Sequence, residues 1–291
     1  MVSNRIKKGL FEWHPVPHSC AFNERIQFII LHYTVANEED SLKILTRGKV
    51  SSHYLLGKAP KGGVPKLYPL VAEHKRAWHA GKSVWQGKSE LNDCSIGIEI
   101  VNSGGNIPEG DNSFSEKVTF EPFQEEQIKA VIVLVKDLMN YYKIPPSHVI
   151  GHSDVAPTRK IDPGAAFPWK RLAKEGIGLW PDDRVVAALQ KEVDERDGGF
   201  LREVQAKLWQ VGYRQTPQSG EYDEITKKIL RAFHLHFRQD DIRPVANART
   251  WALLEALIKL QEAEQAKEDE KQAERLANCR KLKEEADKKG K

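Results

Sequence analysis

Cysteine is scarce in this sequence. The three cysteines, Cys20, Cys94 and Cys279, are odd in number and far apart along 291 residues, and no two of them form a C-x-x-C pair. This spacing argues against a disulfide framework, which needs paired cysteines at short intervals. The thiols therefore give no sign of an oxidising compartment.

Blocks of one charge sign are also missing. The chain has 45 basic and 41 acidic residues, so its net charge is only +4. Proteins that bind nucleic acid usually carry a basic patch or a Lys/Arg run, and none is evident here. Nucleic acid is therefore not an expected partner.

Long hydrophobic runs are absent too. No stretch approaches the roughly 20 apolar residues of a transmembrane helix. The first 18 residues contain two lysines, but no apolar run follows them as it does in a secretory signal. The chain is therefore expected to be soluble and, by sequence, cytoplasmic. The alternative is a periplasmic or exported protein whose leader is missing from this chain or whose export route is non-standard.

Two domains are expected from the length and the pattern of elements. Short apolar runs predict strands, and amphipathic stretches ended by Gly or Pro predict helices between them. The predicted strands are 27–33, 51–57, 95–102 and 148–152, and the predicted helices are 37–48 and 123–144. Strands interleaved with helices indicate an α/β or α+β domain over residues 1–181.

The pattern changes after Pro181. Amphipathic stretches at 200–212, 223–237 and 248–260 predict a small three-helix domain over residues 182–260. Residues 261–291 are dense in charge of both signs, which is typical of a solvated single helix or a disordered tail. We assign this tail no catalytic role, and any protein partners that it has are unknown.

Two histidines and an aspartate stand at the ends of separate predicted elements. His32 ends the strand at 27–33, and His152 and Asp162 flank a loop that Pro163 and Gly164 stiffen. A single histidine at a strand end is usually structural, but two imidazoles and a carboxylate are a frequent ligand set for catalytic zinc. Because no C-x-x-C pair is present, an open catalytic site is favoured over a closed structural one.

Hydrolysis at such a metal also needs a proton carrier and a cation. Glu99 lies on the face of its predicted strand opposite Ile96, Ile98 and Ile100, and a carboxylate beside a dry metal site can carry a proton. Lys160, two residues before Asp162, can stabilise a developing oxyanion. The alternatives are an ordinary strand-face residue for Glu99 and a solvated loop lysine for Lys160.

Four segments resemble the zinc-dependent N-acetylmuramoyl-L-alanine amidases of the type-2 amidase family, which have the peptidoglycan-recognition-protein fold. The segments are FIILHYT, SSHYLL, RAWHAGKSVWQGKSELNDCSIGIEIVN and GHSDVAPTRKIDPGAAFPW, in the family's order. The resemblance is greatest to the AmiD branch, and LREVQAKLWQVGY resembles the first helix of that branch's peptidoglycan-binding domain. It implies a central mixed β-sheet flanked by helices, followed by the small helical domain.

The resemblance also implies roles for individual residues. One Zn²⁺ would be held by His32, His152 and Asp162, with Glu99 as the catalytic carboxylate and Lys160 as the lysine that stabilises the transition state. The resemblance also assigns Tyr33, Trp78, His79 and Arg159 to the groove that binds the substrate. A cation such as Arg159 would suit the carboxylates of a stem peptide. Trp78 could equally be a core aromatic, while His53 and His74 are expected to be structural or exposed.

The implied reaction is hydrolysis of the amide between N-acetylmuramic acid and L-alanine of the stem peptide. Its substrates would be peptidoglycan or (anhydro)muropeptides, in cell-wall turnover or recycling, and the preference between them stays open. The alternative is a non-catalytic protein of the same fold that binds peptidoglycan fragments. Such relatives typically lose a metal ligand, and all three are present here. The chain differs from the AmiD branch in lacking a lipid-anchoring cysteine near its start and in its added tail.

Overall fold

A five-stranded mixed sheet forms the centre of the protein. The computed structural model describes residues 25–106 and 118–289, with side chains as far as residue 278. The strands are β1 (Phe28–Tyr33), β2 (Tyr54–Leu56), β3 (Leu67–Pro69), β6 (Ser95–Ile100) and β7 (Val149–Gly151), in the order β3-β2-β6-β1-β7. Pairs β2·β6, β6·β1 and β1·β7 are parallel, whereas β3 runs antiparallel to β2. The predicted mixed sheet is confirmed.

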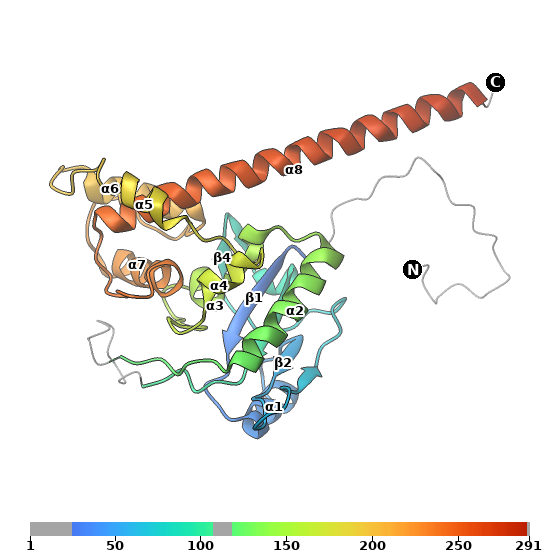
Figure 1. Cartoon of the computed structure of the whole chain (residues 1–291), viewed down its shortest axis with the longest axis horizontal. Coiled ribbons are helices and arrows are strands. Elements are labelled where there is room, and N and C mark those ends of the chain that lie inside the picture. The colour runs from blue at the N-terminus through green and yellow to red at the C-terminus, as the bar shows by residue number, and fades with distance from the viewer. Residues whose placement is uncertain (1–24, 107–117, 290–291) are drawn as a thin grey trace. The chain divides into compact units, whose positions relative to one another are not determined.

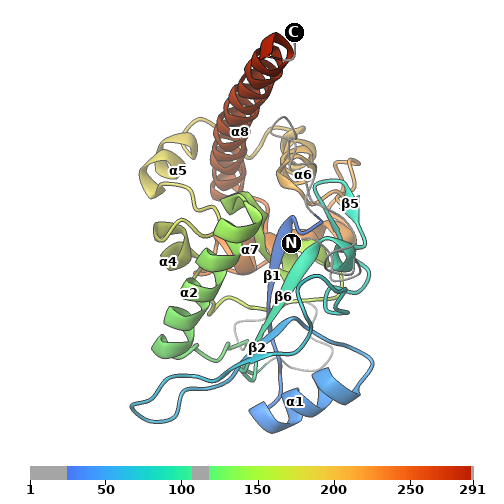
Figure 2. The same ribbon diagram turned by 90° about the vertical axis from the view of Figure 1, so that its right-hand side faces the viewer.

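Alternating residues of β1 pack into two different hydrophobic cores. Ile29 and Leu31 pack in one core with the isoleucines of β6, whereas Phe28 and Ile30 belong to the other. Successive side chains of a strand point to opposite faces, so β1 is buried on both sides. Helix α2 (Glu125–Tyr142) covers the first face, alongside β1 in Figures 1 and 2.

The predicted helices beside the sheet are confirmed within one or two residues of their ends. Helix α1 (Glu38–Arg47) begins after Asn37, whose side chain accepts a hydrogen bond from the backbone of Asp40, and it ends at Gly48. Helix α2 ends at Lys143, which takes a left-handed conformation just before Pro145. Capping side chains and proline set these boundaries, as expected from their local geometry.

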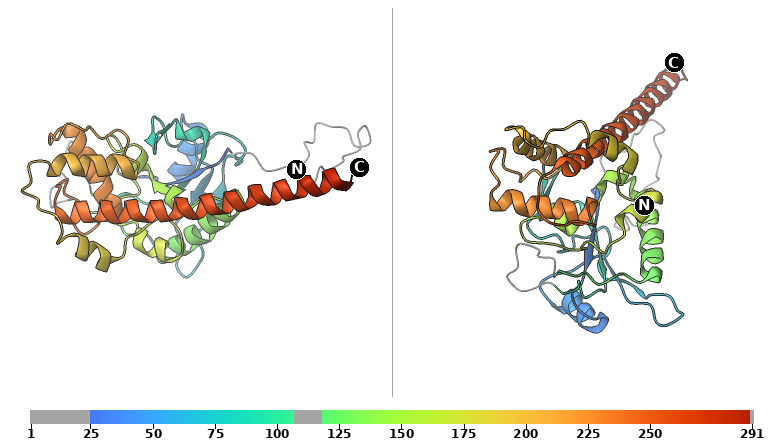
Figure 3. Two further views of the ribbon diagram at one scale, coloured as in Figure 1. Left: turned by 90° about the horizontal axis from the view of Figure 1, so that it is seen from above. Right: turned by 60° about the vertical axis from the view of Figure 1, so that its left-hand side comes forward.

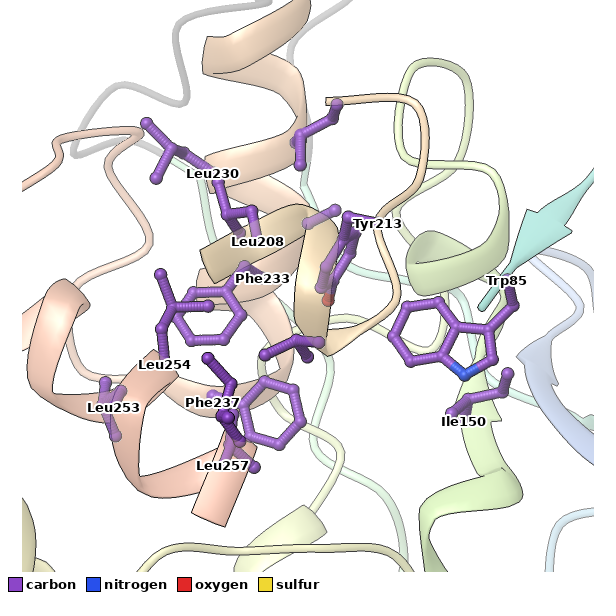
Figure 4. Packing of buried hydrophobic residues seen from close by; sticks show 14 of the residues in the cluster. Trp85, Ile150, Leu208, Tyr213, Leu230, Phe233, Phe237, Leu253, Leu254 and Leu257 are labelled. Carbon is purple, nitrogen blue, oxygen red and sulfur yellow. The ribbon is translucent and has the colours of Figure 1, made fainter. Parts of the chain in front are cut away.

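Helices from the C-terminal part of the chain cover the second face. They are α3 (His152–Val155), α6 (Phe200–Val211), α7 (Glu224–Phe237) and the start of α8 (Ala248–Lys289). Figure 3 shows α2 in green on one side of the blue β1 and α7 in orange on the other. One continuous core joins Phe28 and Ile30 of the sheet to Phe233 and Leu254 of these helices, and Figure 4 shows its helical part.

The same core extends to a small hairpin formed by β4 (Val84–Trp85) and β5 (Lys88–Ser89). The Trp85 ring meets Tyr213 edge to face, with centroids 5.0 Å apart. Residues 24–264 consequently form one compact unit. The domain boundaries after residues 181 and 260 stay predictions.

The sequence analysis missed several short elements. These include the strands β3, β4 and β5, the helices α3, α4 (Trp169–Lys174) and α5 (Asp183–Leu189), and the single turns η1 (Leu91–Asp93) and η2 (Pro146–His148). The helix expected to end at residue 260 instead continues as α8 to Lys289. The described part of the tail is therefore a helix, which was one of its two predicted alternatives. Its Ala, Glu, Lys and Gln residues are strong helix formers, and ion pairs one turn apart, such as Lys271 with Glu268, support it.

The structure describes most of the C-terminal end of the chain but not its first 24 residues. The part of α8 from Gln265 onward lies outside the compact unit of residues 24–264. No helix within residues 25–106 and 118–289 has the length and apolar character needed to cross a membrane. The first 18 residues, in which no leader was found, lie outside the described residues.

Candidate active site

The carboxyl ends of three neighbouring parallel strands bring the predicted site together. His32 of β1 stands directly opposite Glu99 of β6, and His152 follows immediately after β7. Side chains after adjacent parallel strands gather at one edge of the sheet, where open α/β sheets bind their ligands. Asp162 joins them through the backbone, since the N–H of Ser153 donates to its carbonyl at 2.8 Å.

Three buried side-chain atoms form a small triangle at this edge. Nδ1 of His32 lies 2.9 Å from Nδ1 of His152 and 3.1 Å from Oδ2 of Asp162. Nδ1 of His152 lies 3.0 Å from the same oxygen. Among the residues that the structure describes, these three are the one His/Cys/Asp/Glu cluster spaced to hold a metal ion. The predicted ligands therefore converge.

The tautomer of His152 follows from its second ring nitrogen. Nε2 lies 3.1 Å from the carbonyl oxygen of Ala80. A carbonyl can only accept a hydrogen bond, so Nε2 carries a proton, and Nδ1 is the ring nitrogen that can offer a lone pair. His152 thus presents a ligand atom to the triangle.

The tautomer of His32 follows from a longer chain of bonds. The hydroxyl of Ser95 donates to the carbonyl of Leu91 at 2.6 Å, so its oxygen must accept from Nε2 of His79, 3.2 Å away. Nδ1 of His79 is then without a proton and accepts from Nε2 of His32 at 3.1 Å. His32 therefore also presents an unprotonated Nδ1 to the triangle.

The charges of the triangle favour a cation. Burial and the neighbouring His152 lower the pKa of His32 to about 4, so its ring is neutral at pH 7. Burial opposes ionisation of Asp162, but His152 and His32 hold the pKa of that carboxyl well below its usual range. Two imidazole nitrogens and a carboxylate oxygen about 3 Å apart converge on one point, and a cation placed there interacts favourably with all three. The residues present fit a metal centre.

Glu99 lies beside the triangle on the face predicted for it. Its Oε1 is 3.9 Å from Nδ1 of His32, and its side chain is only 14% exposed. Among the described residues its buried Oε2 has no hydrogen-bond partner. Burial and the charge of Asp162 raise the pKa of Glu99 well above its ordinary value. A carboxyl with a raised pKa and a free oxygen is suited to take up and release a proton.

A cavity of about 190 Å³ opens over the triangle and Glu99. Its wall includes seven of the nine predicted site residues, namely Tyr33, Trp78, His79, Glu99, His152, Lys160 and Asp162. Trp78 is 54% exposed, with the Arg76 guanidinium 4.0 Å from its ring centre, so it is not a core aromatic. The cavity therefore combines the metal ligands with one cation and an accessible aromatic surface.

Arg159 does not line this cavity. Its guanidinium donates hydrogen bonds to the carbonyls of Ala80 and Lys82, and so ties the loop that orients His152. Its assignment to stem-peptide carboxylates stays a prediction, as does that of His79 to the groove. His53 is buried and bonded to Gly97 and Lys75, whereas His74 is exposed, as expected for both.

The sequence analysis missed the residues that support the ligands. Ser95 and the carbonyl of Ala80 orient them, and the side chain of Asn92 accepts from the backbone of His79 and Ala80 at 3.0 and 2.8 Å. A Cβ at Gly97 would lie 2.4 Å from the His79 ring, so glycine leaves room for that ring. Strand alternation was the available signal, because Ser95 and Gly97 share a face with Glu99.

Comparison with known proteins identifies the family. Residues 22–165 match the Amidase_2 family, N-acetylmuramoyl-L-alanine amidase. Over 239 residues the chain is 40% identical to N-acetylmuramoyl-L-alanine amidase AmiD from Escherichia coli K12, covering 80% of this chain and 83% of AmiD.

Two solved structures share the fold. The complex of E. coli AmiD with anhydro-N-acetylmuramic acid-L-Ala-D-γ-Glu-L-Lys matches with a TM-score of 0.72 and 38% identity, over 83% of this chain and 91% of that one. AmpDh3 from Pseudomonas aeruginosa, in complex with anhydromuramic pentapeptide, matches with a TM-score of 0.73 and 32% identity, over 90% and 99%. As its motifs predicted, the chain belongs to the Amidase_2 family of N-acetylmuramoyl-L-alanine amidases and is AmiD-like.

Proposed function

We propose that this chain is a zinc-dependent amidase that hydrolyses the bond between N-acetylmuramic acid and L-alanine of the stem peptide. The observation that carries the proposal is the set of three converging ligand atoms, from His32, His152 and Asp162, beside a buried carboxyl of raised pKa. Anhydromuropeptides are proposed as substrates because the related structures of AmiD and AmpDh3 contain them. The complete ligand set favours an enzyme over a non-catalytic receptor of the same fold.

Zinc suits the donor set of His32, His152 and Asp162. Two imidazoles and a carboxylate are a common catalytic zinc set that leaves a fourth position for water or substrate. Ligands about 2.0 Å from a tetrahedral ion lie about 3.3 Å apart, close to the spacing of 2.9 to 3.1 Å found here. When bound, zinc would act as a Lewis acid and make water a nucleophile near neutral pH.

Glu99 would carry the proton in this reaction. Hydrolysis of an amide requires a proton to leave the attacking water and another to reach the departing amine. The buried Oε2 of Glu99 has no other partner among the described residues, so it is available for both transfers. The raised pKa of Glu99 brings the carboxyl nearer to the pH at which it works.

Lys160 would stabilise the oxyanion that develops on the cleaved amide. It lies in the wall of the cavity, on the loop between His152 and Asp162. A fixed cation in a site that excludes water is worth more than one in bulk solvent, because the local dielectric is low. Trp78 and Tyr33, on the same wall, offer apolar surface to the substrate.

The test is product analysis by mass spectrometry with purified anhydromuropeptides. We expect release of the free stem peptide, with L-alanine at its new amino terminus, and loss of that product in the presence of a chelator. Muropeptide that binds but stays intact with zinc supplied would show a receptor instead. Cleavage that continues unchanged with the chelator would exclude the metal.

His79 offers a separate test of the tautomer argument. His79→Phe keeps a ring of similar size but removes the acceptor for Nε2 of His32, so we expect zinc affinity to fall about 10- to 100-fold. His79→Asn, which returns an oxygen near the position of Nδ1, should recover part of the loss. Competition with a chromogenic chelator measures both.

The control is His148→Phe, which alters a half-buried histidine bonded to the carbonyl of Gln27. It should leave zinc affinity unchanged. Equal affinities for His79→Phe and the unaltered protein would show that His79 does not orient His32.

A further inference from the structure

Asp154 is a buried carboxylate that the proposed reaction does not use. It lies two residues after His152, and its side chain is fully buried. Its Oδ2 accepts from the backbone N–H of Gly151 at 2.7 Å and from Nδ1 of His236 at 2.8 Å. Its Oδ1 accepts from the hydroxyl of Tyr213 at 2.5 Å. Three donors thus hold one carboxylate next to a metal ligand.

Two of these donors come from the C-terminal helices. Tyr213 follows α6, and His236 lies in the last turn of α7, so they reach Asp154 across 59 and 82 residues of sequence. Both are nearly inaccessible, at 1% and 3% exposure. Figure 4 shows Tyr213 between the helical core and Trp85. The His236 ring stacks on Trp169, with centroids 3.9 Å apart. Packing therefore fixes both donors.

Asp154 in turn holds the backbone turn that carries the ligands. Its bond to Gly151 closes the first turn of α3, where His152 is the first residue. Ser153, inside the same turn, donates to the carbonyl of Asp162. A displacement of this turn would therefore move both His152 and Asp162.

We propose that Tyr213 and His236 position the metal-binding turn through Asp154, so that the C-terminal helices are part of the support of the metal centre. They act as positioning residues, since neither contacts a ligand atom. The inference rests on the proposed function only in taking zinc as the metal.

The chemistry of the cluster explains why the donors matter. An ionised carboxylate only accepts hydrogen bonds, and leaving one buried without its donors is costly. Burial and the charge of Asp154 raise the pKa of Tyr213 well above its ordinary value, which keeps the phenol protonated as a donor. Without that donor, Asp154 would be expected to turn toward other donors and release the turn.

The experiment compares zinc affinity in full-length variants. Tyr213→Phe removes one oxygen atom, and His236→Phe removes the Nδ1 donor but keeps an aromatic ring against Trp169. We expect each to weaken zinc binding about tenfold, at the lower end of the range for groups that support metal ligands. The absorption spectrum of the Co²⁺-substituted protein should also change, since it reports ligand geometry. His236→Asn, which keeps a donor near Nδ1, should recover part of the affinity.

Tyr142→Phe is the matched control, because its hydroxyl also donates to a carboxylate, that of Glu73, away from the metal loop. It should lower the melting temperature without changing zinc affinity. If Tyr213→Phe behaves like this control, with normal affinity and an unaltered Co²⁺ spectrum, the inference is wrong. Failure of the unaltered protein to bind zinc would instead overturn the proposed function, so the two results are distinct.

Discussion

Replacing Glu99 with glutamine is expected to abolish most amidase activity while leaving the metal and the substrate bound. Glutamine has the same shape but cannot take up or release a proton in this way. Positioned general acid–base groups typically contribute 10²- to 10⁴-fold to the rate, so kcat should fall by about that factor. Glu99 lies 3.9 Å from the nearest ligand atom, Nδ1 of His32, so zinc affinity should stay within a few fold.

The measurement is steady-state cleavage of an anhydromuropeptide beside a zinc titration. Glu90→Gln is the control, since that side chain is 58% exposed and is not among the residues that line the cavity. It should leave kcat unchanged. A Glu99→Gln protein that keeps normal kcat would show that another group moves the proton.

Removing the metal should abolish activity, and zinc should restore it. A chelator removes the bonds that the metal makes to the three ligand atoms of the folded protein, so the metal-free protein should also melt at a lower temperature. A ligand that binds only the folded state at 1,000 times its Kd stabilises that state by about 4 kcal/mol. Zinc should accordingly raise the melting temperature of the unaltered protein as well as its activity.

The variant His152→Ala distinguishes zinc binding at the proposed site from unspecific zinc binding elsewhere on the protein. It removes one ligand, so zinc should restore neither activity nor melting temperature to the unaltered level. His74→Ala alters an exposed histidine and should respond to zinc like the unaltered protein. If His152→Ala gained as much from zinc as the unaltered protein, the metal would have to bind elsewhere.

The local pattern of the chain was sufficient to single out the candidate ligands and Glu99. Buried parallel strands appear in a sequence as short apolar runs, so a polar residue at the carboxyl end of such a run is easily recognised. His32 and His152 were found in this way, and alternation along β6 placed Glu99 opposite the isoleucines. Strand geometry has a period of two residues, so these placements need no knowledge of distant contacts.

The roles of the supporting residues depended on contacts between distant parts of the chain. His79 holds the tautomer of His32 across 47 residues, and Arg159 bonds to a loop 77 residues away. A side chain's hydrogen-bond partners are set by packing, so composition and spacing could not show that these two groups orient the residues of the site. The C-terminal boundary of α8 was missed for a different, local reason, because helix-forming residues continue α8 past the last apolar position.

The sequence by itself predicted the mixed sheet through its family motifs, the candidate ligand set of His32, His152 and Asp162, and the strand face of Glu99. Strand ends, the alternation of side chains and the family motifs all depend on residues that are close together in the sequence. Only the tertiary structure decided which ring nitrogens face the metal site and that Tyr213 and His236 hold Asp154. Those features arise because folding brings together donors and acceptors tens of residues apart, and most buried polar atoms find their partners among them.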